Sequence, residues 1–97
     1  MSNGRSERRI RKTVSVKVSL VDGPTLIEEA LTENVSPHGV RVLMQQSLRP
    51  RQQAVVISQN EGVSSRAKVI YCQRATENGF AIGLELAARV ESWTRPY

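Results

Sequence analysis

Two arginines in the N-terminal stretch have a type and spacing that suit the recognition of an anionic ligand. They are Arg5 and Arg9, four residues apart. A guanidinium presents a planar fork of N–H donors, so it can bind a phosphate through two hydrogen bonds, and it can also stack on a purine. Two such side chains on one arm can hold a ligand from both sides. The spacing alone is a weak signal, because any basic tail contains such pairs by chance.

A second polar group is the sequence Asn-Val-Ser-Pro-His-Gly at residues 34–39. Asn34 and Ser36 are two positions apart, so their side chains face the same way if a strand continues to this point. Their amide and hydroxyl groups suit a guanine edge or a phosphate oxygen. Gly39 supplies either a positive φ or room for a close approach of the backbone. These residue types are also common in turns, so a purely structural turn is the competing interpretation.

The positive charge of the chain is concentrated at its N-terminus. Of the formal charge of +5 on 97 residues, the first 12 residues contribute five basic side chains against the single acid Glu7. A basic arm on a nearly neutral body can meet nucleic acid, an anionic membrane or a phosphorylated ligand. The alternative is a disordered terminus that only improves solubility.

Residues for catalysis or metal binding are missing from the sequence. His38 is the only histidine and Cys72 the only cysteine, so a zinc site built from nitrogen and sulfur ligands is excluded. Glu28 and Glu29 are adjacent, so in a strand they point to opposite faces and form no acid–base pair. Neither a Walker loop nor a dinucleotide-binding glycine motif is present. We therefore expect no enzyme activity, no metal and no cofactor.

Apolar residues alternate with period two along most of the chain, which predicts strands. Six are expected, at residues 14–20, 25–35, 40–44, 54–58, 64–75 and 80–86. A helix over residues 25–33 competes with the second of them. Asp22-Gly23-Pro24 and Asn78-Gly79 are turn signals.

An antiparallel sheet this short must protect its edges, and closure into a small six-stranded β-barrel does so. The predicted organisation is all-β: a flexible basic arm at residues 1–11, then a barrel domain at residues 12–97. The core must consist mainly of Val, Ile, Leu and Ala, because aromatic residues are scarce. Residues 87–97 form either a short helix or an ordered tail, and we expect Trp93 to pack against the barrel rather than cover a ligand.

The two polar patterns together resemble the PilZ domain family, which pairs an RxxxR arm with a downstream (D/N)xSxxG motif. Arg5 and Arg9 match the first motif, while Asn34, Ser36 and Gly39 match the second. The hairpin around Asn78-Gly79, with its Gly-Leu-Glu-Leu ending, also resembles the last two strands of that family. The resemblance covers about residues 5–86, and the combination is more specific than either motif alone.

The resemblance implies a receptor for the bacterial second messenger cyclic di-GMP, in the cytoplasm. Arg5 and Arg9 would hold the phosphates or stack on guanine, Asn34 and Ser36 would hydrogen-bond the ligand, and Gly39 would let the loop approach it. Arg8 and Arg41 would be weaker contacts. A shifted register, Arg8-x-x-x-Lys12, is an alternative, although lysine can neither bind bidentately nor stack in the same way.

The expected mechanism is ordering of the arm over the barrel when the ligand neutralises its charge. The changed surface would then be presented to a partner protein. Two other functions remain open. One is a PilZ-fold adaptor that binds proteins without a ligand; the other is a nucleic-acid-binding barrel, which the nearly neutral body and the few aromatic residues disfavour.

Overall fold

The computed structural model of the 97-residue chain describes residues 7–22 and 25–94, and this part of the protein consists almost entirely of β-strands. The elements are β1 (Ile10–Arg11), β2 (Ser15–Leu20), β3 (Ile27–Ser36), β4 (Gly39–Met44), β5 (Gln53–Ser58), β6 (Val63–Thr76), β7 (Gly79–Leu86) and the short 3-10 helix η2 (Ser92–Thr94). Among the described residues, no helix is both long and apolar enough to span a membrane.

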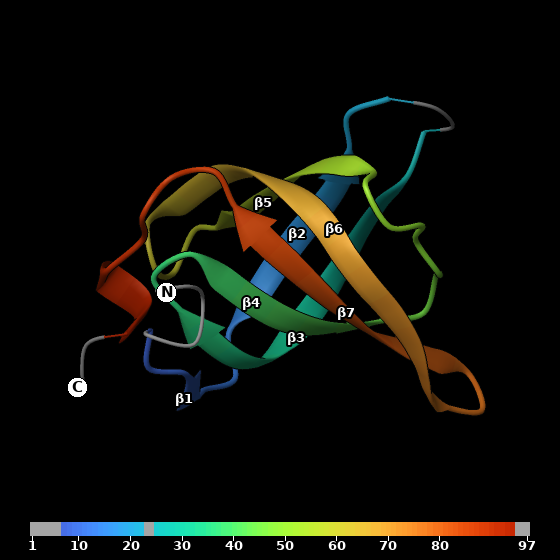
Figure 1. Cartoon of the computed structure of the whole chain (residues 1–97), viewed down its shortest axis with the longest axis horizontal. Helices are drawn as coiled ribbons and strands as arrows, with labels where there is room; N and C mark the ends of the chain where they lie inside the picture. Colours follow the sequence, from blue (N-terminus) through green and yellow to red (C-terminus); the bar gives the residue numbers. More distant parts are fainter. Residues whose placement is uncertain (1–6, 23–24, 95–97) are drawn as a thin grey trace, which may run out of the picture.

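The six longer strands form a closed antiparallel barrel, as the sequence predicts (Figure 1). Their order is β3-β2-β5-β6-β7-β4, and a further pairing of β3 with β4 closes the circle. The short strand β1 lies outside the circle and pairs with the end of β3. Because every barrel strand has a neighbour on each side, the edges of the sheet are satisfied by closure.

The core is built mainly from valine, in agreement with the composition. Inward-facing side chains from all six strands contribute, and those less than 2% exposed include Val16, Val18, Val35, Val40, Val42, Val56, Val69 and Ile82. Trp93 of η2 is also fully buried and belongs to this cluster. The prediction that Trp93 packs against the barrel is therefore confirmed.

The second predicted strand is confirmed as β3, and the competing helix is absent. Ile27 and Leu31 are 63% and 52% exposed, whereas Val35, on the same parity, is fully buried. The register with β4 explains this change, because it shifts between Thr32 and Asn34. Glu33 is thus an extra residue in β3, a β-bulge that reverses which side chains face inward.

The bulge is associated with a break between β1 and β2. Thr32 is 2% exposed, and its hydroxyl donates to the Lys12 carbonyl oxygen at 2.6 Å and accepts from the Val14 backbone N–H at 2.8 Å. One side chain therefore satisfies two backbone groups where the strand ladder is interrupted. The result is that residues 10–11 continue alongside β3 as β1.

The chain reversals agree with the turn signals. The hairpin predicted at Asn78-Gly79 joins β6 to β7, with Glu77 and Asn78 as the two loop residues. Cys72 is half-buried on β6, as expected of a small strand residue. Within the C-terminal residues 87–97, the described part contains only the three-residue helix η2.

We predict that Thr32→Val destabilises the protein by about 2–4 kcal/mol, because two buried backbone groups lose their partner and each costs roughly 1–3 kcal/mol. Urea unfolding followed by circular dichroism measures the change. Thr13→Val is the matched control, since Thr13 is exposed, and its effect should stay within about 0.5 kcal/mol. Equal stability of Thr32→Val and the parent would show that the hydroxyl does not hold the strand break.

Candidate functional site

The predicted polar motif lies where β3 turns into β4. Asn34 and Ser36 are on the last residues of β3, Gly39 is the first residue of β4, and Ser36 pairs with Gly39 across the turn. Pro37 and His38 form the two-residue turn between them. The tight turn and the closing β3–β4 pairing fix this motif to the barrel wall.

Strand β1 brings Arg9 to the motif. Ile10 pairs with Val35 and Arg11 with Asn34, so the residue before them lies over the end of β3. Arg9 donates from Nη1 to Oδ1 of Asn34 at 2.6 Å. Two residues 25 positions apart in the sequence are thereby in direct contact.

Gly39 makes room for this contact. It does not have a positive φ, which in the described chain occurs only at Gly62 among the glycines. A Cβ atom at Gly39 would lie 3.1 Å from Nη2 of Arg9 and 3.1 Å from Oγ of Ser36. Of the two roles that the sequence allowed for Gly39, close approach is therefore the one present.

Glu7 also binds the turn, through both of its carboxylate oxygens. Oε1 accepts from the His38 backbone N–H at 3.0 Å and from the Ser36 hydroxyl at 3.3 Å. Oε2 lies 2.5 Å from Nδ1 of His38 and 3.8 Å from Nη1 of Arg89. The only acid of the basic stretch is thus placed among hydrogen-bond donors and a cation.

The surroundings of Glu7 favour its charged form. Burial raises the pKa of its carboxyl group, but hydrogen bonds from the His38 ring and backbone, the charge of His38 and a hydrogen bond from Ser36 act in the opposite direction. Together they outweigh burial, so the pKa of Glu7 lies below its ordinary value. At neutral pH the turn therefore holds a carboxylate.

Residues 86–93 hold the same turn from the other side, by donating hydrogen bonds to the carbonyl groups of the turn. Nε1 of Trp93 donates to the Ser36 carbonyl oxygen at 3.0 Å. The backbone N–H groups of Val90 and Leu86 donate to the carbonyl oxygens of Pro37, at 2.7 Å, and of His38, at 2.8 Å. Three consecutive carbonyl groups thus have partners from residues 86–93, which leaves the turn little freedom to move.

Lys12 connects β1 to this C-terminal segment. Its side chain is buried and donates from Nζ to the Trp93 carbonyl oxygen at 2.9 Å and to Oε1 of Glu61 at 3.2 Å. In Figure 1, β1, the β3–β4 turn and η2 all lie at one end of the barrel, opposite the β6–β7 turn. The contacts of Lys12 and Trp93 hold these three elements together.

The remaining predicted residues are placed differently. Arg5 lies outside the described residues, and Arg8 is exposed. Arg41 is the cross-strand partner of Asn34, but it donates from Nε to Glu33 at 2.6 Å and from Nη1 to the Tyr71 hydroxyl at 2.9 Å. These bonds raise the pKa of Arg41 and hold its charge beside the motif.

Sequence reasoning did not identify Glu7, His38 and Arg89 as parts of the site. From the sequence, Glu7 is only the acid that reduces the charge of the arm, and His38 is only the single histidine of a chain that lacks a zinc site. Arg89 stands 50 residues or more from both motifs. No pattern in the sequence signals their proximity, except that Glu7 is the sole acid in the basic stretch.

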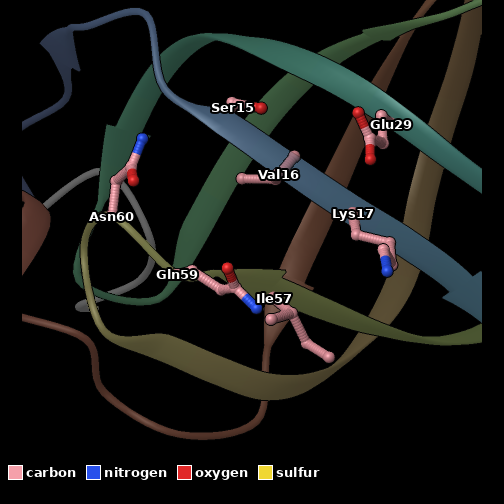
Figure 2. A pocket seen from close by; sticks show the side chains of 7 residues that line it. All are labelled: Ser15, Val16, Lys17, Glu29, Ile57, Gln59 and Asn60. Atoms are coloured by element: carbon pink, nitrogen blue, oxygen red, sulfur yellow. The ribbon is translucent and has the colours of Figure 1, made fainter.

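Two hollows of the described barrel surface lie beside the strands, and one of them borders the motif. One is lined by β2, β3, β5 and the residues after β5; Lys17 and Glu29 lie beside it as cross-strand partners (Figure 2). Another, on the outer face between β1 and β4, includes Asn34 among its lining residues. Within residues 7–22 and 25–94, no three His, Cys, Asp or Glu side chains are grouped as a metal site would require.

Comparison with known proteins identifies a family and a similar structure. The chain matches the family model described as the PilZ domain over residues 3–93. Among solved structures, the Bacillus subtilis inhibitor of motility MotI/DgrA is similar, with a TM-score of 0.72 and 13% sequence identity. The similarity covers 97% of this chain but 48% of that one, so this chain corresponds to about half of its length. No match was found among curated protein sequences.

We predict that Trp93→Phe loosens the turn, because the buried Ser36 carbonyl loses its donor. The cost should be about 2–4 kcal/mol, from an unsatisfied carbonyl of roughly 1–3 kcal/mol and a smaller ring. Urea unfolding measures the stability, and amide hydrogen exchange at Val90 reports the turn. Tyr71→Phe is the control, because it removes a hydrogen bond of another aromatic residue, to Arg41, that does not touch the turn. Unchanged exchange at Val90 would contradict a holding role for Trp93.

A second prediction concerns the pH dependence of the Glu7 contacts. Since the pKa of Glu7 is lowered in the folded protein, its stabilising effect is complete above the ordinary pKa of about 4.3 and is lost as pH falls through the lowered value. The His38 amide resonance should therefore move in an NMR titration with a midpoint below about 4.3. Among the described residues, His38 and Arg89 are the ionisable groups that contact Glu7, and Arg89 also pairs with Glu91. In Glu7→Gln this transition should be absent; its persistence would assign it to another group.

Proposed function

The chain belongs to the PilZ domain family, and we propose that it is a receptor for cyclic di-GMP. The proposed binding residues are Arg5, Arg9, Asn34, Ser36 and Gly39. One observation carries the proposal: Nη1 of Arg9 lies 2.6 Å from Oδ1 of Asn34, and Nη2 of Arg9 would lie only 3.1 Å from a Cβ atom at Gly39. Residues of the two motifs, far apart in the sequence, thus meet at one point of the barrel.

The chemistry of this point suits a guanine nucleotide with phosphates. Asn34 accepts one N–H of Arg9, which leaves the other donors of the guanidinium fork for a phosphate or for stacking on a base. The amide group of Asn34 retains two N–H donors for a base acceptor. Charge-assisted hydrogen bonds of this kind contribute about 1.5–3 kcal/mol each, so a few of them reach micromolar affinity, about −8 kcal/mol.

The contacts of Lys12 support the Arg5/Arg9 register over the Arg8/Lys12 alternative. Lys12 is buried and bonded to the Trp93 carbonyl and Glu61, so it serves the C-terminal segment. Arg8 is exposed beside Arg9 and is proposed as a third contact. Arg41 is proposed as a peripheral one, since its guanidinium is already paired with Glu33 and Tyr71.

In the proposed mechanism the arm closes over the bound ligand. Ordering a backbone costs about 1–2 kcal/mol per residue, and the docking of residues 7–11 on β3 reduces the number of residues that must still be ordered. The closed arm would present a new surface to a partner protein in a bacterial cytoplasm. The proposed role is that of a receptor, with no catalytic step and no cofactor.

We expect Arg9→Ala to weaken cyclic di-GMP binding about 10- to 100-fold, because the variant loses one or two charge-assisted hydrogen bonds. Each tenfold change in the dissociation constant corresponds to about 1.4 kcal/mol. Isothermal titration calorimetry measures the affinity. Arg49→Ala is the matched control, because it removes the same charge from an exposed position in the β4–β5 loop. Equal affinity of Arg9→Ala and the parent would defeat the assignment of Arg9.

The same titration with GTP and a short single-stranded DNA tests the ligand class. Saturable binding of cyclic di-GMP alone supports the receptor. Binding of DNA with a strong salt dependence would indicate a nucleic-acid-binding barrel instead. Absence of binding with all three would favour a PilZ-fold adaptor whose partners are proteins.

A further inference from the structure

The β3–β4 turn contains an anion-binding site that the chain fills with its own carboxylate. Four groups surround Glu7: the Ser36 hydroxyl, the His38 backbone N–H, Nδ1 of His38 and the Arg89 guanidinium, at 3.3, 3.0, 2.5 and 3.8 Å. They come from the end of β3, the turn and the segment after β7. Of these residues, only Ser36 occupies a defining position of the two motifs, and His38 stands at a variable position of the second.

The arrangement of these groups suits two oxygens of one anion. Oε1 of Glu7 takes the hydroxyl and the backbone N–H, while Oε2 takes the imidazole and faces the guanidinium. Hydroxyl, backbone amide, imidazole and guanidinium are the groups with which proteins bind phosphate oxygens. A phosphate diester has two non-bridging oxygens that can occupy the same two positions.

The site lies beside the residues proposed above to bind the ligand. Ser36 belongs to it and also lies next to Gly39, over which Arg9 is placed. An anion held by Arg9 is therefore adjacent to the carboxylate of Glu7 and is repelled by it. Three carbonyl groups of the turn are fixed by the C-terminal segment, so the donors stay in place when the carboxylate leaves.

We propose that a phosphate of the ligand replaces Glu7, with His38 and Arg89 as additional binding residues and Glu7 as a built-in competitor. The identity of the ligand rests on the proposed function, whereas the site itself rests on this chain's own contacts. Glu7 stands between Arg5 and Arg9 in the sequence. Its displacement releases the arm from the turn at the moment when the arginines engage the ligand.

With competition of this kind, the apparent dissociation constant equals the intrinsic one divided by the fraction of molecules in which the site is free. If Glu7 occupies the site in about nine molecules of ten, Glu7→Gln binds cyclic di-GMP on the order of tenfold more tightly. Adding Arg89→Ala to Glu7→Gln should remove most of this gain. Glu7→Gln thus tests the role of Glu7 as competitor, and the added Arg89→Ala tests the role of Arg89 in the anion site.

Calorimetric titration of the full chain with cyclic di-GMP measures these affinities. Glu77→Gln is the matched control, because it removes the same charge from the exposed β6–β7 turn at the opposite end of the barrel (Figure 1). Tighter binding in Glu7→Gln but not in Glu77→Gln supports the proposal. Unchanged or weaker binding in Glu7→Gln overturns it, because Glu7 would then be a structural contact only.

A second titration makes the result independent of the proposed ligand. Inorganic pyrophosphate is added to 15N-labelled parent and Glu7→Gln, and the resonances of the His38 amide and of the Arg89 guanidinium, whose Nη1 faces the site while its Nε donates to Glu91, are followed. The proposal expects saturable shifts at both groups, at lower concentration in Glu7→Gln. If these shifts occur while neither protein binds cyclic di-GMP, the proposed function fails and the anion site stands. Absence of the shifts in Glu7→Gln overturns the anion site, even if cyclic di-GMP binds.

Discussion

The extra residue in β3 is the constraint on which the rest of the arrangement depends. Glu33 has no counterpart in β4, and its insertion reverses the alternation of the strand. Val35 consequently points into the core and Asn34 away from it. Without the insertion, an amide side chain would face an apolar interior at a cost of roughly 1–3 kcal/mol, and a valine would face water. The polar character of this end of the barrel therefore follows from one local irregularity.

The same irregularity determines where the N-terminal stretch can lie. Opposite the bulge, the chain is not part of a strand between β1 and β2, and Thr32 bonds the backbone of Lys12 and Val14 in this interval. Lys12 turns inward at this gap, toward Trp93. The preceding residues can then run along the end of β3, which delivers the basic stretch to the β3–β4 turn. The bulge at Glu33, the hydrogen bonds of Thr32 and the buried Lys12 thus together determine the position of Arg9.

Much of the architecture was predictable because it depends on short-range patterns. Alternation of apolar with polar residues indicated most of the strands, and closure followed from the need to protect sheet edges. The bulge at Glu33 was not predictable, since it breaks the alternation that served as the signal. The proximity of Arg9 to Asn34 could be expected only because the two motifs together resemble those of the PilZ domain family. The partners of Glu7, in contrast, are brought together by the fold from positions 29 to 82 residues away, and no local pattern carries that information.

Both ends of the described chain meet at the same end of the barrel. Glu7 lies near Arg89, and Lys12 binds the carbonyl of Trp93, while the β6–β7 hairpin extends at the far end (Figure 1). In a modular protein this geometry has a consequence for signal output. A domain joined next to residue 7 or residue 94 would have its linker beside the β3–β4 turn and the contacts of Glu7 and Lys12. Loss of the Glu7 contacts would then alter the linker geometry directly, without transmission through the barrel.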